Sequence, residues 1–470
     1  MIEPSAIVLL PPLLAILLAL ISRQVYLSLA AGIWMGYTLL ANGSTLSGLA
    51  NAIDGVIAVL QSPGDARVIV FTLVIGGLIA TLEASGGVRG FVSWLEARRW
   101  VNNAKRSQWL AWGTGLIIFI ESNITVLVAG TVSRPLFDRY KVSREKLAYL
   151  IDSTSAPICI LIPLNAWGAF NLGLLNGVGV DHPLSVFLWA IPLNFYAISA
   201  VLMSLAVVVF DWNIGPMKTA EARAARGEHL SPGATPMMDD QLLNQTLSTG
   251  IRPRALNMIL PIAVLVAAMP LGLWITGDGD LLKGSGSTSV LWAVLLAVAT
   301  AWFLQLLQRQ LSLTQLTDIF LKGAGGIVPL AIILLLALAL GDVSQLLKTG
   351  EYVAGLLGDT VAPSLLLPLL FIIAAVIAFS VGSSWGTFAI MIPIAVPVAQ
   401  ALGLPVAPFV AAVLSGGIFG DHASPISDTT VVSSMAAATD HIDHVRTQLP
   451  YALLAGLISL LAFGVVGMTL

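Results

Sequence analysis

The sequence predicts an all-α polytopic membrane protein, because it is apolar along most of its length and carries little charge. Of its 470 residues, 57% are hydrophobic and only 10% are charged, and the mean hydropathy is +0.91. A soluble domain carries about 25% charged residues. Apolar runs of about 18 residues or more, the length that crosses about 30 Å of hydrocarbon, recur along the chain. We therefore expect helices that cross a lipid bilayer many times.

The apolar runs predict about ten crossings and two re-entrant hairpins. No basic residue precedes the first run, which is therefore expected to be a membrane helix rather than a cleaved signal peptide. The runs 110–137 and 364–402 are interrupted by small polar residues, and we expect each to enter the membrane and return as a hairpin. Crossings are expected near 5–21, 25–41, 67–85, 144–170, 185–210, 255–276, 288–305, 324–341, 405–438 and 449–468.

A polar stretch separates two halves of the chain that resemble each other. Residues 211–254 are punctuated by Pro and Gly and mixed in charge, so they are expected to form a solvent-exposed linker. The segment "IDSTSAPI" (151–158), in residues 1–210, aligns with "GDHASPI" (420–426), in residues 255–470. Three further pairs of similar segments occur in the same order along the two halves. The sequence therefore predicts two five-helix membrane repeats, with the second inverted relative to the first.

The distribution of Lys and Arg predicts how these repeats lie in the membrane, because cytoplasmic loops carry an excess of basic residues. We place the N- and C-termini outside, the linker inside, and both interrupted runs in hairpins. All of the 22 basic residues except Arg67, Lys283 and Lys348 then lie on the cytoplasmic side. The pattern predicts a multi-pass membrane protein with a cytoplasmic linker, and the bacterial inner (cytoplasmic) membrane is the setting that we expect for it.

The composition also excludes several classes of protein. The single cysteine, Cys159, excludes an intrachain disulfide and a multi-cysteine metal site. The chain has no Walker loop, no G-x-G-x-x-G motif opening a helix, and no polar region large enough for a nucleotide-binding domain. We therefore expect neither an enzyme nor an ATP-driven pump, and neither a resident cofactor nor a nucleic-acid partner.

The main candidate site is the polar segment "GDHASPISDTT" (420–430) within an apolar run. Pro425 predicts a broken helix, and "STSAP" (153–157) predicts the same in the first half. Free carbonyls at such a break, together with hydroxyls and a carboxylate, form an oxygen cage suited to Na⁺. Asp421 and Asp428 are expected to be the main ion and proton ligands, with Asp152 in support. The alternative for each is a carboxylate that only caps a helix end or faces solvent.

Further polar side chains at the breaks and hairpin tips extend this site. Oxygens beside the carboxylates are expected from Ser424, Ser427 and Thr429. The two hairpin tips, the first of which begins at Glu121, are expected to meet at mid-membrane and contribute oxygens. Substrate contacts at the tips and the first break are expected from Ser122, Asn123, Thr125, Ser383, Ser384, Thr387, Ser153 and Ser155, although these side chains could instead only bond their own turns. His422 is expected either to titrate near neutral pH or to donate to a backbone carbonyl. His441 and His444 are expected in a solvated connector.

With these residues in view, the chain resembles the NhaC family of sodium/proton antiporters, within the wider ion-transporter superfamily. The resemblance is carried by "GSSWGTFAIMIPIA" (382–395) and "GIFGDHASPISDTTVVSS" (417–434). It implies two inverted five-helix repeats, paired hairpins, and a homodimer with a central scaffold and moving transport units. It places Asp421, Asp428 and the neighbouring Ser and Thr residues near the ion site, opposite Asp152 and the first hairpin tip. Many relatives have Lys where this chain has His422.

Two functions are open at this point. The first is secondary active Na⁺/H⁺ antiport by alternating access, in which cytoplasmic Na⁺ exchanges for external H⁺. The second is Na⁺-coupled transport or exchange of a small organic acid or amino acid on the same scaffold, with Asn123 and the hairpin amides binding the solute carboxylate. A passive channel is a third and weaker hypothesis. We find no Arg on a membrane segment to pair with a solute carboxylate, which favours the first function.

Overall fold

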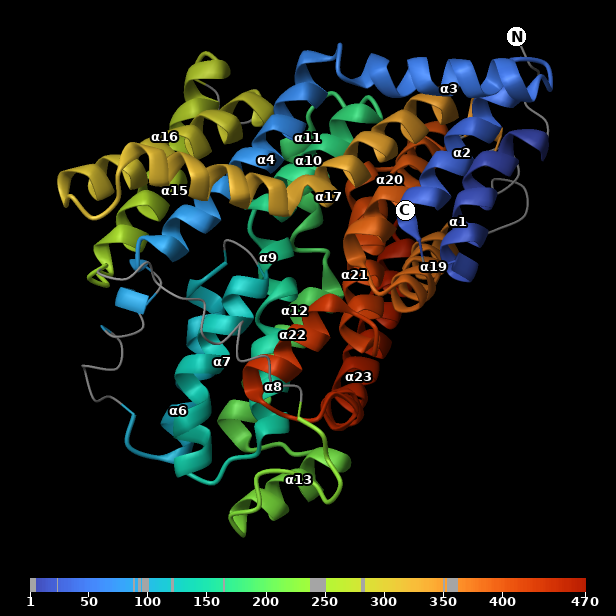
Figure 1. Ribbon diagram of the computed structural model, residues 1–470. Helices are drawn as coiled ribbons and strands as arrows, with labels where there is room; N and C mark the ends of the chain where they lie inside the picture. Colours follow the sequence, from blue (N-terminus) through green and yellow to red (C-terminus); the bar gives the residue numbers. More distant parts are fainter. Residues whose placement is uncertain are drawn as a thin grey trace.

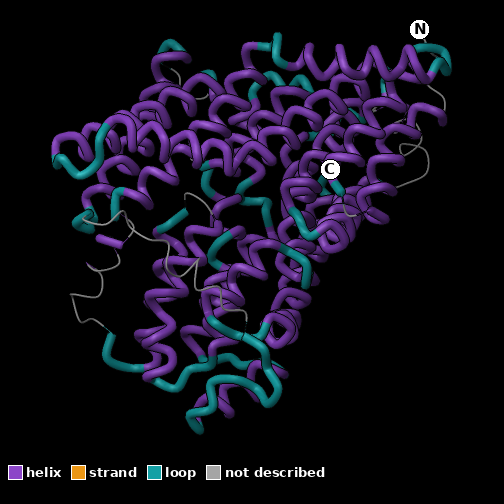
Figure 2. Tube along the Cα trace, viewed as in Figure 1, coloured by secondary structure: helices purple, strands orange, loops and turns teal. Residues whose placement is uncertain are grey.

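The protein folds into helices along nearly all of its described length (Figures 1 and 2). A computed structural model describes residues 6–22, 24–87, 89–91, 94, 101–119, 122–163, 165–236, 251–279, 284–349, 351–352 and 362–470. Within these ranges no strand forms beyond one isolated bridge between Pro236 and Asp440. The predicted all-α class is confirmed.

Most helices of the first half are short, and several follow one another after a sharp bend. They are η1 (Ala6–Leu9), α1 (Leu10–Ser22), α2 (Val25–Leu40), α3 (Thr45–Val59), α4 (Pro63–Ala84), α6 (Ala104–Ile117), α7 (Ser122–Arg139), α8 (Arg144–Ser153), α9 (Ala156–Leu161), α10 (Ala166–Gly177), α11 (Pro183–Ala190) and α12 (Phe195–Phe210).

The helices of the linker and of the second half are longer on average. They are α13 (Pro216–Ala225), α15 (Leu256–Thr276), α16 (Gly286–Leu307), α17 (Leu313–Leu346), α19 (Pro363–Val381), α20 (Ser384–Ala401), α21 (Val406–Ala423), α22 (Asp428–Ala437) and α23 (His441–Gly467). In Figure 1, α15–α17 lie in the upper part of the molecule, and α6–α8, α22 and α13 lie in the lower part.

The described helices fit a multi-pass membrane protein. Seven of them are long and apolar enough to cross a bilayer, and the number rises to ten where each bent pair counts as one span. The bends are 42° between α8–α9 and α10, 41° between α11 and α12, and 41° within α17 near Pro329. A bent or broken helix inside a bilayer frees backbone groups that must face protein or a polar cavity.

Both interrupted runs form helical hairpins, and both predicted helix breaks are present. Helix α6 packs on α7, and α19 packs on α20. The second hairpin turns at Gly382, whose φ of 71° is left-handed and whose added Cβ would lie 2.6 Å from the carbonyl oxygen of Ile426. The first break separates α8 from α9 at Thr154–Ser155, and the second separates α21 from α22 at Ser424–Ser427.

Close helix packing fixes the second break against the second hairpin. A Cβ added to Gly416 would lie 2.3 Å from the carbonyl oxygen of Phe371, and one added to Gly420 would lie 2.2 Å from that of Ala375. Two glycines four residues apart let helix backbones approach each other in a membrane. Helix α21 therefore lies directly on α19, with Asp421 next to this contact.

Three elements differ from the sequence expectation. The criterion of apolar length misses α3, because its 15 residues are too short to cross a bilayer. Helix α17, with 34 residues, extends well beyond the expected 324–341. The linker is not wholly solvent-exposed, since α13 buries Met217 and Ala224 and forms ion pairs with the start of α8. Residues 237–250 of the linker lie outside the described ranges.

Candidate functional site

Asp421 is a buried carboxylate that joins the second helix break to the tip of the second hairpin. It lies near the end of α21 and is 1% exposed. The Ser427 hydroxyl, at the start of α22, donates to Oδ1 at 2.7 Å, and the Ser384 hydroxyl, at the start of α20, donates to Oδ2 at 3.2 Å. Thr429 Oγ1 lies 2.9 Å from Ser427 Oγ. The structure thus gathers four of the expected residues into one oxygen-rich cluster.

The other expected residues of this half bond to backbone or lie outside the described side chains. Ser424 donates to the carbonyl of Phe379 at 2.7 Å, which ties the break to α19. Ser383 caps α20 by accepting from the Gly386 amide at 3.3 Å, and Thr387 donates to the Ser383 carbonyl at 2.9 Å. Asp428 begins α22, but its side chain is not among those described.

Asp152 is the corresponding carboxylate of the first half, and its hydrogen-bond donors come from the second half. It is the penultimate residue of α8 and is 1% exposed. Its Oδ2 accepts from Gln448 Nε2 at 2.7 Å and from the Thr430 hydroxyl at 3.3 Å. Among the described residues, Oδ1 has no hydrogen-bond partner. Both halves of the chain therefore build this site.

Two buried imidazoles flank Asp152. His422 Nε2 and His444 Nε2 each lie 3.9 Å from its Oδ2. His422 Nδ1 lies 2.8 Å from the Tyr196 hydroxyl, and His422 Nε2 lies 3.3 Å from the Ser153 hydroxyl. The His422 ring therefore contacts hydroxyls, and the expectation that it donates to a backbone carbonyl is wrong. Because His422 follows Asp421 in the chain, it links the two carboxylate clusters.

The first hairpin lies against α8 and α22. Ser122 and Thr125 are buried, and the Thr125 hydroxyl donates to the Ile118 carbonyl, which closes the turn. Ser155 donates to the backbone carbonyl of Asp152 at 2.8 Å. Glu121 and the side chain of Asn123 lie outside the described residues. That the two hairpin tips meet stays a prediction.

The expectation for His441 and His444 is wrong, because they lie in the first turn of α23 and not in a solvated connector. His444 is fully buried beside Asp152, and His441 is half-buried. Sequence reasoning also missed Gln448 and Tyr196 as neighbours of the carboxylates. A signal was present, since His441, His444 and Gln448 are spaced i, i+3 and i+7, which puts them on one face of a helix.

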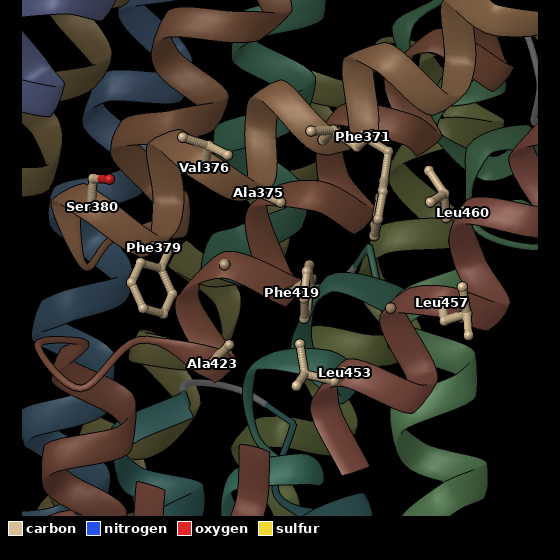
Figure 3. Close-up of a pocket in the computed structure, with 13 residues that line it drawn as sticks. Phe371, Ala375, Val376, Phe379, Ser380, Phe419, Ala423, Leu453, Leu457 and Leu460 are labelled. Carbon is tan, nitrogen blue, oxygen red and sulfur yellow. The ribbon is translucent and has the colours of Figure 1, made fainter. Parts of the chain in front are cut away.

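An apolar pocket of about 360 Å³ lies beside the second break, between α19, α21 and α23 (Figure 3). Phe371 and Phe379 line it from α19, Phe419 from α21, and Leu453 from α23. The described residues of its wall are apolar or glycine apart from Ser380. Gly420 and Ala423, which flank the Asp421–His422 pair in the sequence, also line the pocket. Among the described residues of its wall, the pocket offers only the Ser380 hydroxyl as a polar side-chain group, whereas the Asp421 cluster holds a carboxylate and several hydroxyls.

Known proteins resemble this chain at three levels. The model of the Na⁺/H⁺ antiporter family matches residues 176–468. An uncharacterized protein of Haemophilus influenzae is 33% identical over 483 residues, which cover 98% of this chain and 90% of that protein. The malate-2H(+)/Na(+)-lactate antiporter of Bacillus subtilis is 35% identical over 109 residues, or 23% of each chain. In fold, the Alcanivorax borkumensis YdaH transporter matches with a TM-score of 0.61 at 16% identity, covering 90% of this chain and 89% of that one.

Proposed function

The chain belongs to the Na⁺/H⁺ antiporter family and is a secondary transporter of the antiporter type, and from this premise we propose that it exchanges Na⁺ for H⁺ by alternating access. The observation that carries the proposal is the buried Asp421 carboxylate, held by hydroxyls from the second hairpin and from the start of α22. The Na⁺ and H⁺ are cargo in this proposal, and neither is a resident cofactor.

The chemistry of the Asp421 cluster suits a cation that competes with a proton. An ionised carboxylate inside a membrane is costly unless a positive charge offsets it. Ser384, Ser427 and Thr429 place hydroxyl oxygens at this carboxylate, and each hydroxyl can turn its lone pairs toward a cation. Na⁺ and H⁺ would then occupy one carboxylate in turn, and this mutual exclusion is the physical basis of exchange. Asp428, at the start of α22, is the second proposed ligand.

Asp152 is proposed as the proton-binding carboxylate of the first half. Its surroundings differ from those of Asp421, because an amide and two imidazoles approach it. Imidazoles exchange protons near neutral pH and bind Na⁺ poorly, since Na⁺ prefers oxygen ligands. In this proposal Asp421 holds the exchanged cation, and Asp152 passes protons.

The proposed setting is the bacterial inner membrane, with the N- and C-termini outside and the linker inside. The excess of basic residues in the loops on the linker side supports this orientation. A homodimer with moving transport units remains a proposal from the family resemblance. Labelling Lys105 or Lys218 from outside intact cells would contradict the orientation.

A second candidate function is Na⁺-coupled transport or exchange of a small organic acid or amino acid. The observation that favours it is the local similarity to the malate-2H(+)/Na(+)-lactate antiporter. In that case the backbone amides at the start of α22 and the hydroxyls of Ser427 and Thr429 would donate to a solute carboxylate.

Proton flux in proteoliposomes distinguishes the two functions. The purified protein is reconstituted with a pH dye inside, a pH gradient is set, and Na⁺ is added without any organic solute. For a Na⁺/H⁺ antiporter, Na⁺ collapses the gradient, and protein-free vesicles show no response. If Na⁺ acts only together with malate, lactate or an amino acid, the second function holds and the first is wrong. No flux under either condition, from protein that is folded, overturns both.

A further inference from the structure

We propose that His441, Ser434 and His444 form a binding site for one excess proton, which passes between the start of α23 and Asp152. We call these three residues the proton site. The purpose of the site rests on the proposed function, because a proton path matters only if protons are transported. Its existence rests on hydrogen bonds alone.

The Ser434 hydroxyl lies at the centre of the proton site. Its Oγ is 2.9 Å from Nδ1 of His441, 2.9 Å from Nδ1 of His444, and 2.9 Å from the carbonyl oxygen of Thr430. Ser434 and His444 are fully buried, whereas His441 is half-buried at the start of α23. The single hydroxyl proton of Ser434 therefore has three possible hydrogen-bond acceptors within 2.9 Å of Oγ.

The outer nitrogens of both rings must carry hydrogen. His441 Nε2 lies 2.6 Å from the carbonyl oxygen of Pro425, which only accepts hydrogen bonds. Gln448 Nε2 donates to the carbonyl of His422 at 2.7 Å, and this fixes which way the Gln448 amide faces. Its oxygen therefore points at His444 Nε2, 2.9 Å away, and His444 Nε2 must be the donor.

These assignments leave the neutral site one proton short. A neutral imidazole carries one hydrogen, so both Nδ1 atoms would be bare acceptors when both rings are neutral. Ser434 can donate to only one of them, and the other Nδ1 then faces a lone pair of the hydroxyl oxygen at 2.9 Å. One added proton removes the conflict between the two rings, because the charged ring donates to Ser434 Oγ and Ser434 donates to the other ring in place of the Thr430 carbonyl.

A second added proton is disfavoured by charge. Two imidazolium ions bound to the same hydroxyl oxygen would repel each other strongly in a buried setting. The other charged and titratable groups around the site are Asp152 and Arg144 on α8, His422 on α21, and Asp440 and Asp443 at the start of α23. The carboxylates favour one positive charge on the proton site, while His422 and Arg144 oppose more.

The geometry also provides a route. His441 gives its Nδ1 proton to Ser434 Oγ while Ser434 passes its own proton to His444 Nδ1, so the charge moves inward by one ring. His444 Nε2 lies 3.9 Å from Asp152 Oδ2, and Gln448 bonds to both residues. A small approach of these two groups lets Nε2 release its proton to Oδ2. That step gives a neutral carboxylic acid and a neutral His444 that keeps its hydrogen on Nδ1.

Nitrogen NMR of the intact protein tests proton binding without any transport assay. The full chain is labelled with ¹⁵N-histidine in nanodiscs and titrated from about pH 5 to about pH 9. His→Gln variants at each of the five histidines assign the signals. We expect His441 and His444 to take up one shared proton, with Nδ1 signals that move together. Two rings that both stay singly protonated on Nε2 throughout, or that titrate independently, would overturn the proposal.

Ser434→Ala removes the shared hydroxyl and is the decisive variant. We expect the two rings to lose their coupling, so that their Nδ1 signals no longer move together when a proton is added. Ser434→Thr keeps the hydroxyl and is expected to restore the coupling. Ser459→Ala is the matched control, because Ser459 is a buried serine of α23 that likewise donates to the carbonyl four residues earlier, at 2.6 Å, and bonds no histidine.

The same variants are then assayed for Na⁺-driven proton flux. Ser434→Ala and His441→Gln are expected to slow the flux by about tenfold or more and to shift its pH profile, while Ser459→Ala leaves both unchanged. Thermal stabilisation by Na⁺ should be the same in all of them, because Asp421 is intact. Wild-type flux and pH profile in Ser434→Ala would refute the route. Shared proton binding without any Na⁺-driven flux in the wild type would leave the proton site standing and overturn the proposed antiport.

Discussion

Asp152 and Asp421 occupy similar places, each just before a helix break, yet their partners differ in kind. Asp421 is held by the hydroxyls of Ser384 and Ser427. Asp152 is held by Gln448 and approached by two imidazoles. Hydroxyl oxygens can ligate a hard cation, whereas imidazoles carry protons. In the proposed exchange, these different neighbours are the reason for assigning Na⁺ to Asp421 and the proton to Asp152.

The helices that carry the two carboxylates are also held differently. Helix α8 begins at a cluster of charges, where Lys146 pairs with Glu221 at 2.8 Å and Glu145 pairs with Arg223, both partners coming from α13. Helix α21 begins with apolar Val406 and is held by glycine contacts to α19. The Asp152 side is therefore joined to the linker by ion pairs, whereas the Asp421 side is packed on the second hairpin.

The largest effects are expected when each of the two carboxylates is replaced by its amide, and these effects should differ between the two positions. Asp421→Asn is expected to reduce Na⁺-driven proton flux to the level of protein-free vesicles and to abolish thermal stabilisation by Na⁺. Asp152→Asn is expected to impair the flux but to keep the stabilisation by Na⁺, because its carboxylate lies among proton carriers. Flux and melting curves on the same preparations measure both.

The opposite pattern would contradict this division of roles. Stabilisation by Na⁺ that is lost in Asp152→Asn and kept in Asp421→Asn would assign the cation to the first half. Asp181→Asn serves as a control, because Asp181 is exposed before α11 and no shift from wild type is expected.

The next largest effect is a loss of stability, expected when the ion pairs between the start of α8 and α13 are broken. Glu221→Ala removes the carboxylate that binds Lys146 and also accepts from the Ser143 amide and hydroxyl at 2.8 and 2.6 Å. The Lys146 side chain is 0% exposed, so it would keep a buried charge with only Asp211 at 3.8 Å. Removing one partner of a buried ion pair costs about 3 kcal/mol. Denaturant unfolding in detergent measures this loss of stability.

The linker itself supplies the control for this prediction. Glu228→Ala breaks an exposed pair with Arg226 at 3.3 Å, where both side chains are more than half exposed. Exposed pairs contribute about 0–1 kcal/mol. Equal losses in the two variants would mean that α13 does not anchor α8.

The sequence predicted the framework of the site well, because its main features are local. Pro425 predicts a helix break, small polar residues within the apolar run 364–402 predict a hairpin, and a carboxylate inside an apolar run must have a partner. Ser384, Ser427 and Thr429 lie close in sequence to such features, and they gather at Asp421.

What the sequence could not show are contacts between residues far apart in the chain. Gln448 reaches Asp152 across 296 positions, and Tyr196 reaches His422 across 226. The charges around His441 and His444 suggested solvent, because Asp440 and Asp443 lie beside them. Their burial follows from the position of α23 against α8 and α22, which only the fold determines.

A smaller effect tests the hydroxyl ligands of Asp421. Ser427→Ala removes a donor 2.7 Å from Oδ1 and is expected to weaken the apparent affinity for Na⁺ by about tenfold, near 1.4 kcal/mol. Ser424→Ala is the matched control, because its hydroxyl donates to the Phe379 carbonyl rather than to the carboxylate. Titration of Na⁺-driven flux gives both affinities. An equal loss of Na⁺ affinity in Ser424→Ala would show that a disturbed helix break, and not a missing hydroxyl at the carboxylate, lowers the affinity.

The smallest effect concerns the start of the helix that carries the proton site. Burial alone would raise the pKa of Asp440, but hydrogen bonds from the backbone amides of Thr235, Asp443 and Ile442 outweigh it and hold the pKa below its usual value. The folded protein therefore binds this proton more weakly than the unfolded chain, whose Asp pKa is about 3.9. The stabilisation is full above that pH and is lost as the pH falls through the lowered pKa.

Asp440→Ala should accordingly cost about 1 kcal/mol near neutral pH, the usual contribution of a helix N-cap, and the difference from wild type should shrink below about pH 4. Asp440→Asn keeps the cap without the charge, so its stability should depend less on pH. Melting curves of the three proteins across this pH range measure the effect. A difference between wild type and Asp440→Ala that grows as the pH falls would reverse the sign and contradict the role of the charge. Because Asp440 also accepts from the Thr235 amide at 3.0 Å, the same loss would loosen the linker from α23.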